Sequence, residues 1–142
     1  MKQEYWINVT HVDNRLVIYL NGETVWDSGI VHGDPAIDKY INITDLLQAH
    51  PEHHSELIFE GFNDSYTISD EDGEFNPWHF SYRVFRRIIN GEEVIEKDIL
   101  VPYNEKHLSN PNIKAIENAY QIVLKDGLYK VVSNSLSQNF YK

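Results

Sequence analysis

The most constraining feature of this chain is a series of short alternating apolar and polar runs, broken by turn residues about every ten positions. Residues 5–12 alternate between two faces and are rich in aromatic and β-branched side chains, and residues 15–20 repeat the pattern. This period of two predicts β-strands. Asn21-Gly22 and Asn90-Gly91 supply the positive φ angles that tight hairpin turns need. About nine such strands predict an all-β antiparallel sandwich with at most one short helix.

The remaining boundaries follow from local signals. Asn110 before a proline is typical of a helix start, so a short helix is expected over Pro111–Asn118. Tyr40–Leu47 continues the strand pattern, and Asn63–Pro77 reads as a long acidic loop. We expect one sandwich domain over residues 1–132, followed by a polar C-terminal tail over residues 133–142.

Composition excludes several classes of function. The 142 residues contain no cysteine, which excludes disulfide scaffolds, cysteine nucleophiles and thiolate metal sites. Acidic residues number 22 against 12 basic ones, and a net charge of −10 argues against nucleic-acid binding. No apolar run approaches the roughly 20 residues of a membrane span, so no membrane insertion is expected. The first residues lack the apolar stretch of a secretory signal, which predicts a cytoplasmic protein, with export by another route left open.

Three motifs between Arg15 and Asp64 occur in a known order. Asn21-Gly22 ends one strand, Ile43–Leu47 closes a later one, and Leu57–Asp64 forms the strand after that. This segment resembles the galactose-binding-domain-like jelly roll of carbohydrate-binding modules and of the sugar-binding domains of β-galactosidase-type hydrolases. The middle motif begins with Asn42, where the family has Asp. The resemblance implies a jelly-roll sandwich and a sugar ligand.

Turn chemistry also explains the middle motif without a ligand. Thr44 or Asp45 can accept hydrogen bonds from the backbone of the following turn. Leu46 and Leu47 are then expected to point into the core. We therefore interpret these residues as structural.

The candidate binding site lies where the long loops gather. Successive loops of an antiparallel sandwich alternate between its ends, so Asp13-Asn14 and the loops 28–39, 63–77 and 102–111 should share one end. Sugar recognition needs aromatic faces together with Asp, Asn or His to bond hydroxyls, although acidic loops and turn asparagines are also ordinary sandwich surface. The candidate ligand-binding residues are Asp27, His32, Asp34, Asn63, Asp64, Asn76, Trp78 and His79.

Two segments contain residue types that serve as metal ligands in proteins. Asp70 and Asp72 could hold calcium, since hard cations take several carboxylate oxygens, but a solvated acidic loop is the preferred interpretation. His50, His53 and His54 could hold zinc through imidazoles. They lack the helical spacing of known zinc motifs, so an exposed polar loop is the preferred interpretation. No cofactor is required, and calcium remains the alternative.

Two further groups of side chains have competing interpretations. Trp26 and Trp78 either fill the core or stack against a sugar. Three arginines interrupt one apolar strand. The preferred interpretation is that they form cross-strand ion pairs with glutamates beyond the Asn90-Gly91 turn. These arginines are Arg83, Arg86 and Arg87, and the glutamates are Glu92, Glu93 and Glu96.

The sequence contains no catalytic motif, such as a nucleophile elbow, a phosphate-binding glycine loop or a metalloprotease helix. The leading hypothesis is therefore a non-catalytic, lectin-like module that binds a carbohydrate at the long-loop end. The alternative is a protein-interaction or assembly subunit of immunity, phage-structural or toxin-associated type, which binds a basic protein partner or forms a homo-oligomer. A hydrolase is the third option.

Overall fold

A computed structural model describes residues 3–31, 35–63, 68–70, 73–75, 78–88, 92–104 and 113–139. It consists mainly of the two sheets of a β-sandwich. The strands are β1 (Gln3–Asp13), β2 (Arg15–Leu20), β3 (Glu23–Asp27), β4 (Ala36–Asn42), β5 (His54–Asn63), β6 (Ile68–Asp70), β7 (Gly73–Phe75), β8 (Trp78–Ile88), β9 (Glu93–Asn104), β10 (Ile113–Lys125) and β11 (Leu128–Asn139), and the helix is α1 (Thr44–Ala49). No helix in these ranges is long and apolar enough to cross a membrane.

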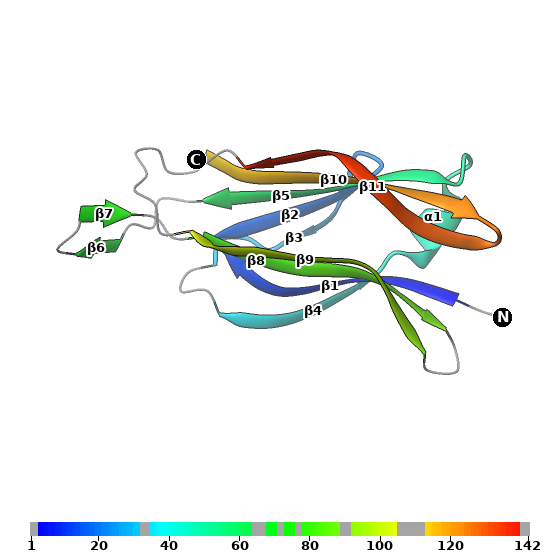
Figure 1. The fold of residues 1–142 in the computed structure, drawn as a ribbon, viewed down its shortest axis with the longest axis horizontal. Coiled ribbons are helices and arrows are strands. Elements are labelled where there is room, and N and C mark those ends of the chain that lie inside the picture. The colour runs from blue at the N-terminus through cyan, green and yellow to red at the C-terminus, as the bar shows by residue number, and fades with distance from the viewer. Residues whose placement is uncertain are drawn as a thin grey trace.

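Nine strands form the two layers seen in Figure 1. One sheet has the order β4-β1-β8-β9 and the other the order β11-β10-β5-β2-β3. Every neighbouring pair is antiparallel. The structure therefore confirms the expected antiparallel sandwich with one short helix. The segment predicted as a long acidic loop contains the small hairpin of β6 and β7.

The core lies between the layers because each strand turns its apolar set inward. Tyr5, Ile7 and Val9 of β1 are buried there, as the period of two predicts. The layers meet where Phe59 of β5 stacks on Tyr82 of β8, with ring centroids 3.9 Å apart and planes 4° apart. Burial of apolar surface between the sheets is the main favourable contribution to the free energy of folding.

Strand register places the long connections at one end, as the loop alternation predicts. Asp13 pairs with His79, and Asn63 pairs with Ile113. The predicted turn at Asp13-Asn14 is where the chain passes from one sheet to the other, because β1 and β2 belong to different sheets. Asn14 forms an isolated bridge with Val31 beyond β3. In Figure 1 this end is on the left, beyond which β6 and β7 extend.

The strand expected over Tyr40–Leu47 is wrong in its second half, where α1 begins at Thr44. Leu47 is 0% exposed, but Leu46 is 44% exposed, so the expectation that both leucines enter the core is also wrong. The reason is that neighbouring residues on a helix point about 100° apart. Asn42 Oδ1 accepts a hydrogen bond from Thr44 N at 3.0 Å at the start of this turn.

The helix expected over Pro111–Asn118 is also wrong over its described residues. Residues 113–118 belong to β10, which pairs with β5 on one side and β11 on the other. Pairing with two neighbours outweighs a local helix-start signal. In addition, the predicted tail continues as β11 as far as Asn139, with residues 136–139 in register with β10.

One hydrogen bond joins the sheets near the opposite end. The Tyr5 hydroxyl of β1 accepts from the backbone N–H of Tyr129 in β11 at 2.9 Å, and this contact is buried. The two rings also meet edge to face, with centroids 5.3 Å apart. The Tyr129 hydroxyl donates to the Leu47 carbonyl of α1 at 3.3 Å. These contacts fix the helix and the last strand to the first strand.

Candidate functional site

The long-loop end is only partly described. His32, Asp34, Asp64, Asp72 and Asn76 lie outside the described residues. Asn63, Asp70 and Trp78 are described by their backbone alone, as members of β5, β6 and β8. Of the sequence candidates, Asp27 and His79 therefore have a described side-chain environment.

Asp27 at the end of β3 is held by an ion pair on the outer face of the five-stranded sheet. Its carboxylate accepts from Arg15 Nε at 3.0 Å and from Arg15 Nη2 at 2.6 Å. It also accepts from the Gly29 backbone N–H at 2.9 Å. The hydrogen bond from Arg15 is the main cause that lowers the pKa of Asp27. The carboxylate thus closes a turn and pairs a guanidinium.

Replacing Arg15 with alanine is expected to raise the pKa of Asp27 toward the ordinary value of about 3.9. Because the pKa is lowered in the folded protein, the stabilisation is present at neutral pH and is lost as pH falls through the lowered pKa. The two side chains are 42% and 38% exposed, so the pair contributes about 1 kcal/mol or less. A carboxyl NMR titration checks the shift. Arg87→Ala is the control, and an equal shift in that variant would contradict the assignment.

His79 of β8 lies beside a second histidine. Its ring stacks on that of His11 in β1, with centroids 4.8 Å apart. Asp13 is opposite His79 in register, and its carboxylate is buried and accepts a short hydrogen bond from Asn14 Nδ2. The two histidines therefore lie at the long-loop end of the outer face of the four-stranded sheet.

That outer face continues away from the loops as a surface that we call the Asn8 face. Residues directly opposite each other across a ladder share a face. Its members are Trp6, Asn8 and Thr10 of β1, Asp38 and Tyr40 of β4, and Ser81, Arg83, Phe85 and Arg87 of β8. They alternate with the residues that enter the core.

The centre of this face is the side-chain amide of Asn8, which is 1% exposed. Its Nδ2 donates to Asp38 Oδ1 at 3.2 Å and to the Lys39 carbonyl at 3.3 Å. Its Oδ1 accepts from Arg83 Nε at 3.2 Å. A buried amide with partners on both sides is fixed in one orientation. Asn8 therefore positions a carboxylate on one side of β1 and a guanidinium on the other.

Aromatic rings form one flank of the Asn8 face. Tyr40 is 42% exposed, and its ring meets Trp6 and Phe85 edge to face, with centroid distances of 6.4 and 6.2 Å. Arg87 lies 5.5 Å from the Trp6 ring centroid and pairs with Glu93 at 2.9 Å. The predicted arginine–glutamate pairing is therefore confirmed for Arg87, whereas Arg83 bonds Asn8 instead.

The outer face of the five-stranded sheet differs in its chemistry. Lys114 pairs with Glu60 at 2.8 Å and with Glu117 at 3.3 Å, and these contacts raise the pKa of Lys114. Arg15 pairs with Asp27, as described above. Charges that pair with one another across a sheet are typical of ordinary solvated surface. Arg87 on the Asn8 face is paired in the same way with Glu93, but Asp38 and Arg83 bond a buried neutral amide and not each other, which favours the Asn8 face as the candidate site.

The Asn8 face can present a carboxylate acceptor, a guanidinium donor and an aromatic ring to one ligand. No family model, curated protein or solved structure matches this chain. The assignment of a function therefore rests on geometry and on the chemistry of these side chains.

Metal binding finds no support in the described part of the chain, where no three His, Asp or Glu side chains are grouped to hold an ion. His53 Nδ1 lies 2.9 Å from the Tyr129 hydroxyl. His54 Nε2 makes a short contact with Gln121 Oε1. The two rings thus bond side chains on different strands.

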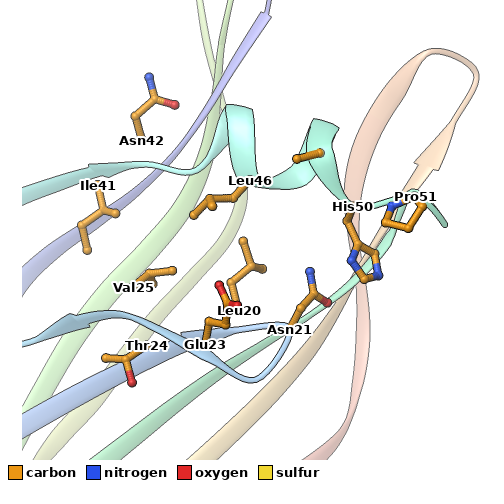
Figure 2. Close-up of a pocket in the computed structure, with 11 residues that line it drawn as sticks. Leu20, Asn21, Glu23, Thr24, Val25, Ile41, Asn42, Leu46, His50 and Pro51 are labelled. Carbon is orange, nitrogen blue, oxygen red and sulfur yellow. The ribbon is translucent and has the colours of Figure 1, made fainter.

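A groove of about 520 Å³ lies at the other end, between β3, β4 and α1 (Figure 2). Leu46 and Val25 face it, and its rim includes two asparagines. Both amides have structural partners: Asn21 bonds the Ser55 hydroxyl and the Glu56 N–H, and Asn42 accepts from Thr44 N. None of the described lining residues is Trp, Tyr or Phe. The groove therefore lacks the aromatic surface found on the Asn8 face.

Proposed function

We propose that this protein is a non-catalytic, lectin-like module that binds a carbohydrate on the Asn8 face. One observation carries the proposal: a buried amide holds Asp38 and Arg83 in place beside the exposed ring of Tyr40. The resemblance of residues 15–64 to the galactose-binding-like pattern supports the same class of ligand. The proposed site extends along the sheet toward His79, which the sequence already selects as a ligand-binding residue.

The chemistry of this face suits a sugar for three reasons. Hydrogen bonds that involve a charged group are roughly twice as strong as neutral ones, and Asp38 and Arg83 supply both polarities. An exposed aromatic ring can cover the apolar C–H surface of a pyranose. Side chains held in position before binding lose less conformational entropy on binding. Strand register places Tyr40 and Arg83 directly opposite Asn8, and the hydrogen bond from Asn8 to Asp38 adds the third group to the same surface.

Tyr40→Ala is expected to weaken glycan binding at least tenfold, which corresponds to about 1.4 kcal/mol. The ring is exposed, so its removal should leave the fold intact. A glycan array on the purified protein, with calcium and then with a chelator, identifies the sugar, and titration calorimetry measures its affinity.

Tyr19→Ala is the matched control, because Tyr19 is a half-buried tyrosine on β2 in the other sheet. Its affinity should stay at the wild-type value. The site would be wrong if both tyrosine variants bound with wild-type affinity. Loss of glycan binding in chelator would show that calcium is required and would support Asp70 and Asp72 as its ligands.

A protein-interaction subunit is the second candidate function, and the composition of the Asn8 face favours it. Trp6, Tyr40 and Arg87 are of the residue types that dominate protein-interface hot spots. The net charge of −10 would attract a basic partner. A blank glycan array together with a salt-sensitive complex with a basic protein would support this function over the first.

A further inference from the structure

We propose that the Asn8 face selects neutral saccharides with two adjacent hydroxyls and discriminates against acidic ones. This inference rests on the proposed carbohydrate-binding function and adds the chemical class of the sugar. It follows from the positions of Asp38 and Arg83 around Asn8 and from the charges on this surface.

The two charged groups demand opposite hydrogen-bonding partners. Asp38 comes from β4 and Arg83 from β8, on either side of β1, and Asp38 Oδ1 and Arg83 Nε each lie 3.2 Å from the one Asn8 amide between them. An ionised carboxylate only accepts hydrogen bonds, and a guanidinium only donates them. Two neighbouring hydroxyls can satisfy both, because one donates to Asp38 while the other accepts from Arg83. A sugar carboxylate could bond Arg83 but would repel Asp38.

The remaining charges on this surface disfavour an anionic ligand. Arg87 is already paired with Glu93. The Trp6 indole N–H donates to the Glu4 carboxylate at 3.0 Å, which adds a further negative charge beside the ring. The chain as a whole carries −10. Negative charges fixed near a site make the binding free energy of an acidic sugar less favourable than that of a neutral one, and this difference is the selectivity.

Asn8 is a positioning residue in this arrangement. Its amide bonds Asp38 and Arg83 at once, and both bonds are 3.2 Å long. Among the described residues, Arg83 bonds Asn8 through its Nε alone, so its two Nη groups can donate to a ligand. The buried amide thus aims the polar edges of two other side chains without itself reaching solvent.

The test compares a panel of neutral mono- and disaccharides with their uronic-acid and sialylated counterparts by titration calorimetry at low salt. The wild-type protein should bind the best neutral sugar at least tenfold more tightly than its acidic counterpart. Asp38→Asn should weaken neutral binding at least fivefold and should bring the two affinities closer together. Asp38 is exposed, and an asparagine oxygen can still accept from Asn8, so this variant should fold.

Asn8→Asp should lose neutral binding at least tenfold, because a carboxylate cannot donate to Asp38. Glu60→Gln, on the outer face of the other sheet, is the control and should bind normally. Preference for acidic sugars, or an unchanged affinity ratio in Asp38→Asn, would overturn this inference while leaving carbohydrate binding in place. Absence of binding to every sugar would overturn the proposed function itself.

Discussion

Phe59→Ala is expected to lower the free energy of unfolding by about 4 kcal/mol, which is a large part of the stability of a domain this size. Phe59 is 0% exposed and lies at the centre of the core. It stacks on Tyr82 across the two sheets and meets Tyr120 edge to face at 5.9 Å. Removing the ring loses buried area and leaves a cavity between two rigid sheets. Urea unfolding followed by circular dichroism measures the change.

The matched control is Phe62→Ala, on the same strand. Phe62 is only half-buried, and Arg15 covers its ring at 5.5 Å on the outer face. Its loss should cost less than half as much as that of Phe59. Similar costs at the two positions would contradict the idea that stability is concentrated where the sheets stack.

Gly61→Ala is the second prediction with a large effect, and we expect a loss of about 3 kcal/mol. A Cβ atom at Gly61 would lie 2.6 Å from Phe80 Cε2 and 2.7 Å from Ile116 Cγ1. Both neighbours are themselves buried, so they cannot move aside without disturbing other core residues. The same unfolding measurement checks the value.

Gly127→Ala separates this steric effect from backbone strain. Gly127 has φ +77° with nothing within 4 Å of the added carbon, so its cost should be only about 1 kcal/mol. The double variant Gly61→Ala/Ile116→Ala should lose less free energy of unfolding than the sum of the losses in the two single variants, because Ile116→Ala opens space for the new methyl group. A fully additive pair would count against the proposed clash.

The turns were the most predictable part of the fold. Asn21 and Gly22 have φ angles of 51° and 83°, which is the geometry that the Asn-Gly pair favours. Asp126 and Gly127 behave in the same way. Turn chemistry depends on two neighbouring residues and needs no tertiary information. The Asn90-Gly91 turn lies outside the described residues.

The helix was not predictable because its signal is nonlocal. Thr44–Ala49 has only 6 residues and forms fewer than two turns, which is too short for a helical period to be recognised in the sequence. Its first residue is held by a contact with distant Tyr5, whose N–H donates to Thr44 Oγ1 at 2.8 Å. The helix-start signal at Asn110-Pro111 is strong locally, but β10 is held by two neighbouring strands.

The sequence predicted a site at the long-loop end, and no member of the Asn8 face was among its candidate ligand-binding residues. The alternation of Trp6 and Asn8 with core residues already places them on one face. However, Tyr40 and Arg83 join Asn8 only because β1 lies between β4 and β8. Strand order is a property of the whole fold, so a single sequence points to loops more readily than to a sheet face.

The hydrogen bond between Tyr5 and Tyr129 has a consequence for synthesis of the chain on the ribosome. Its two residues are 124 positions apart, and β10, which completes the surroundings of β5, also belongs to the last third of the described chain. The N-terminal strands therefore emerge well before the partners that close the sandwich over them. Contacts between residues so distant in sequence also slow folding. Among the described strands, β1 is thus one of the last to reach its final surroundings although it precedes the others in the sequence.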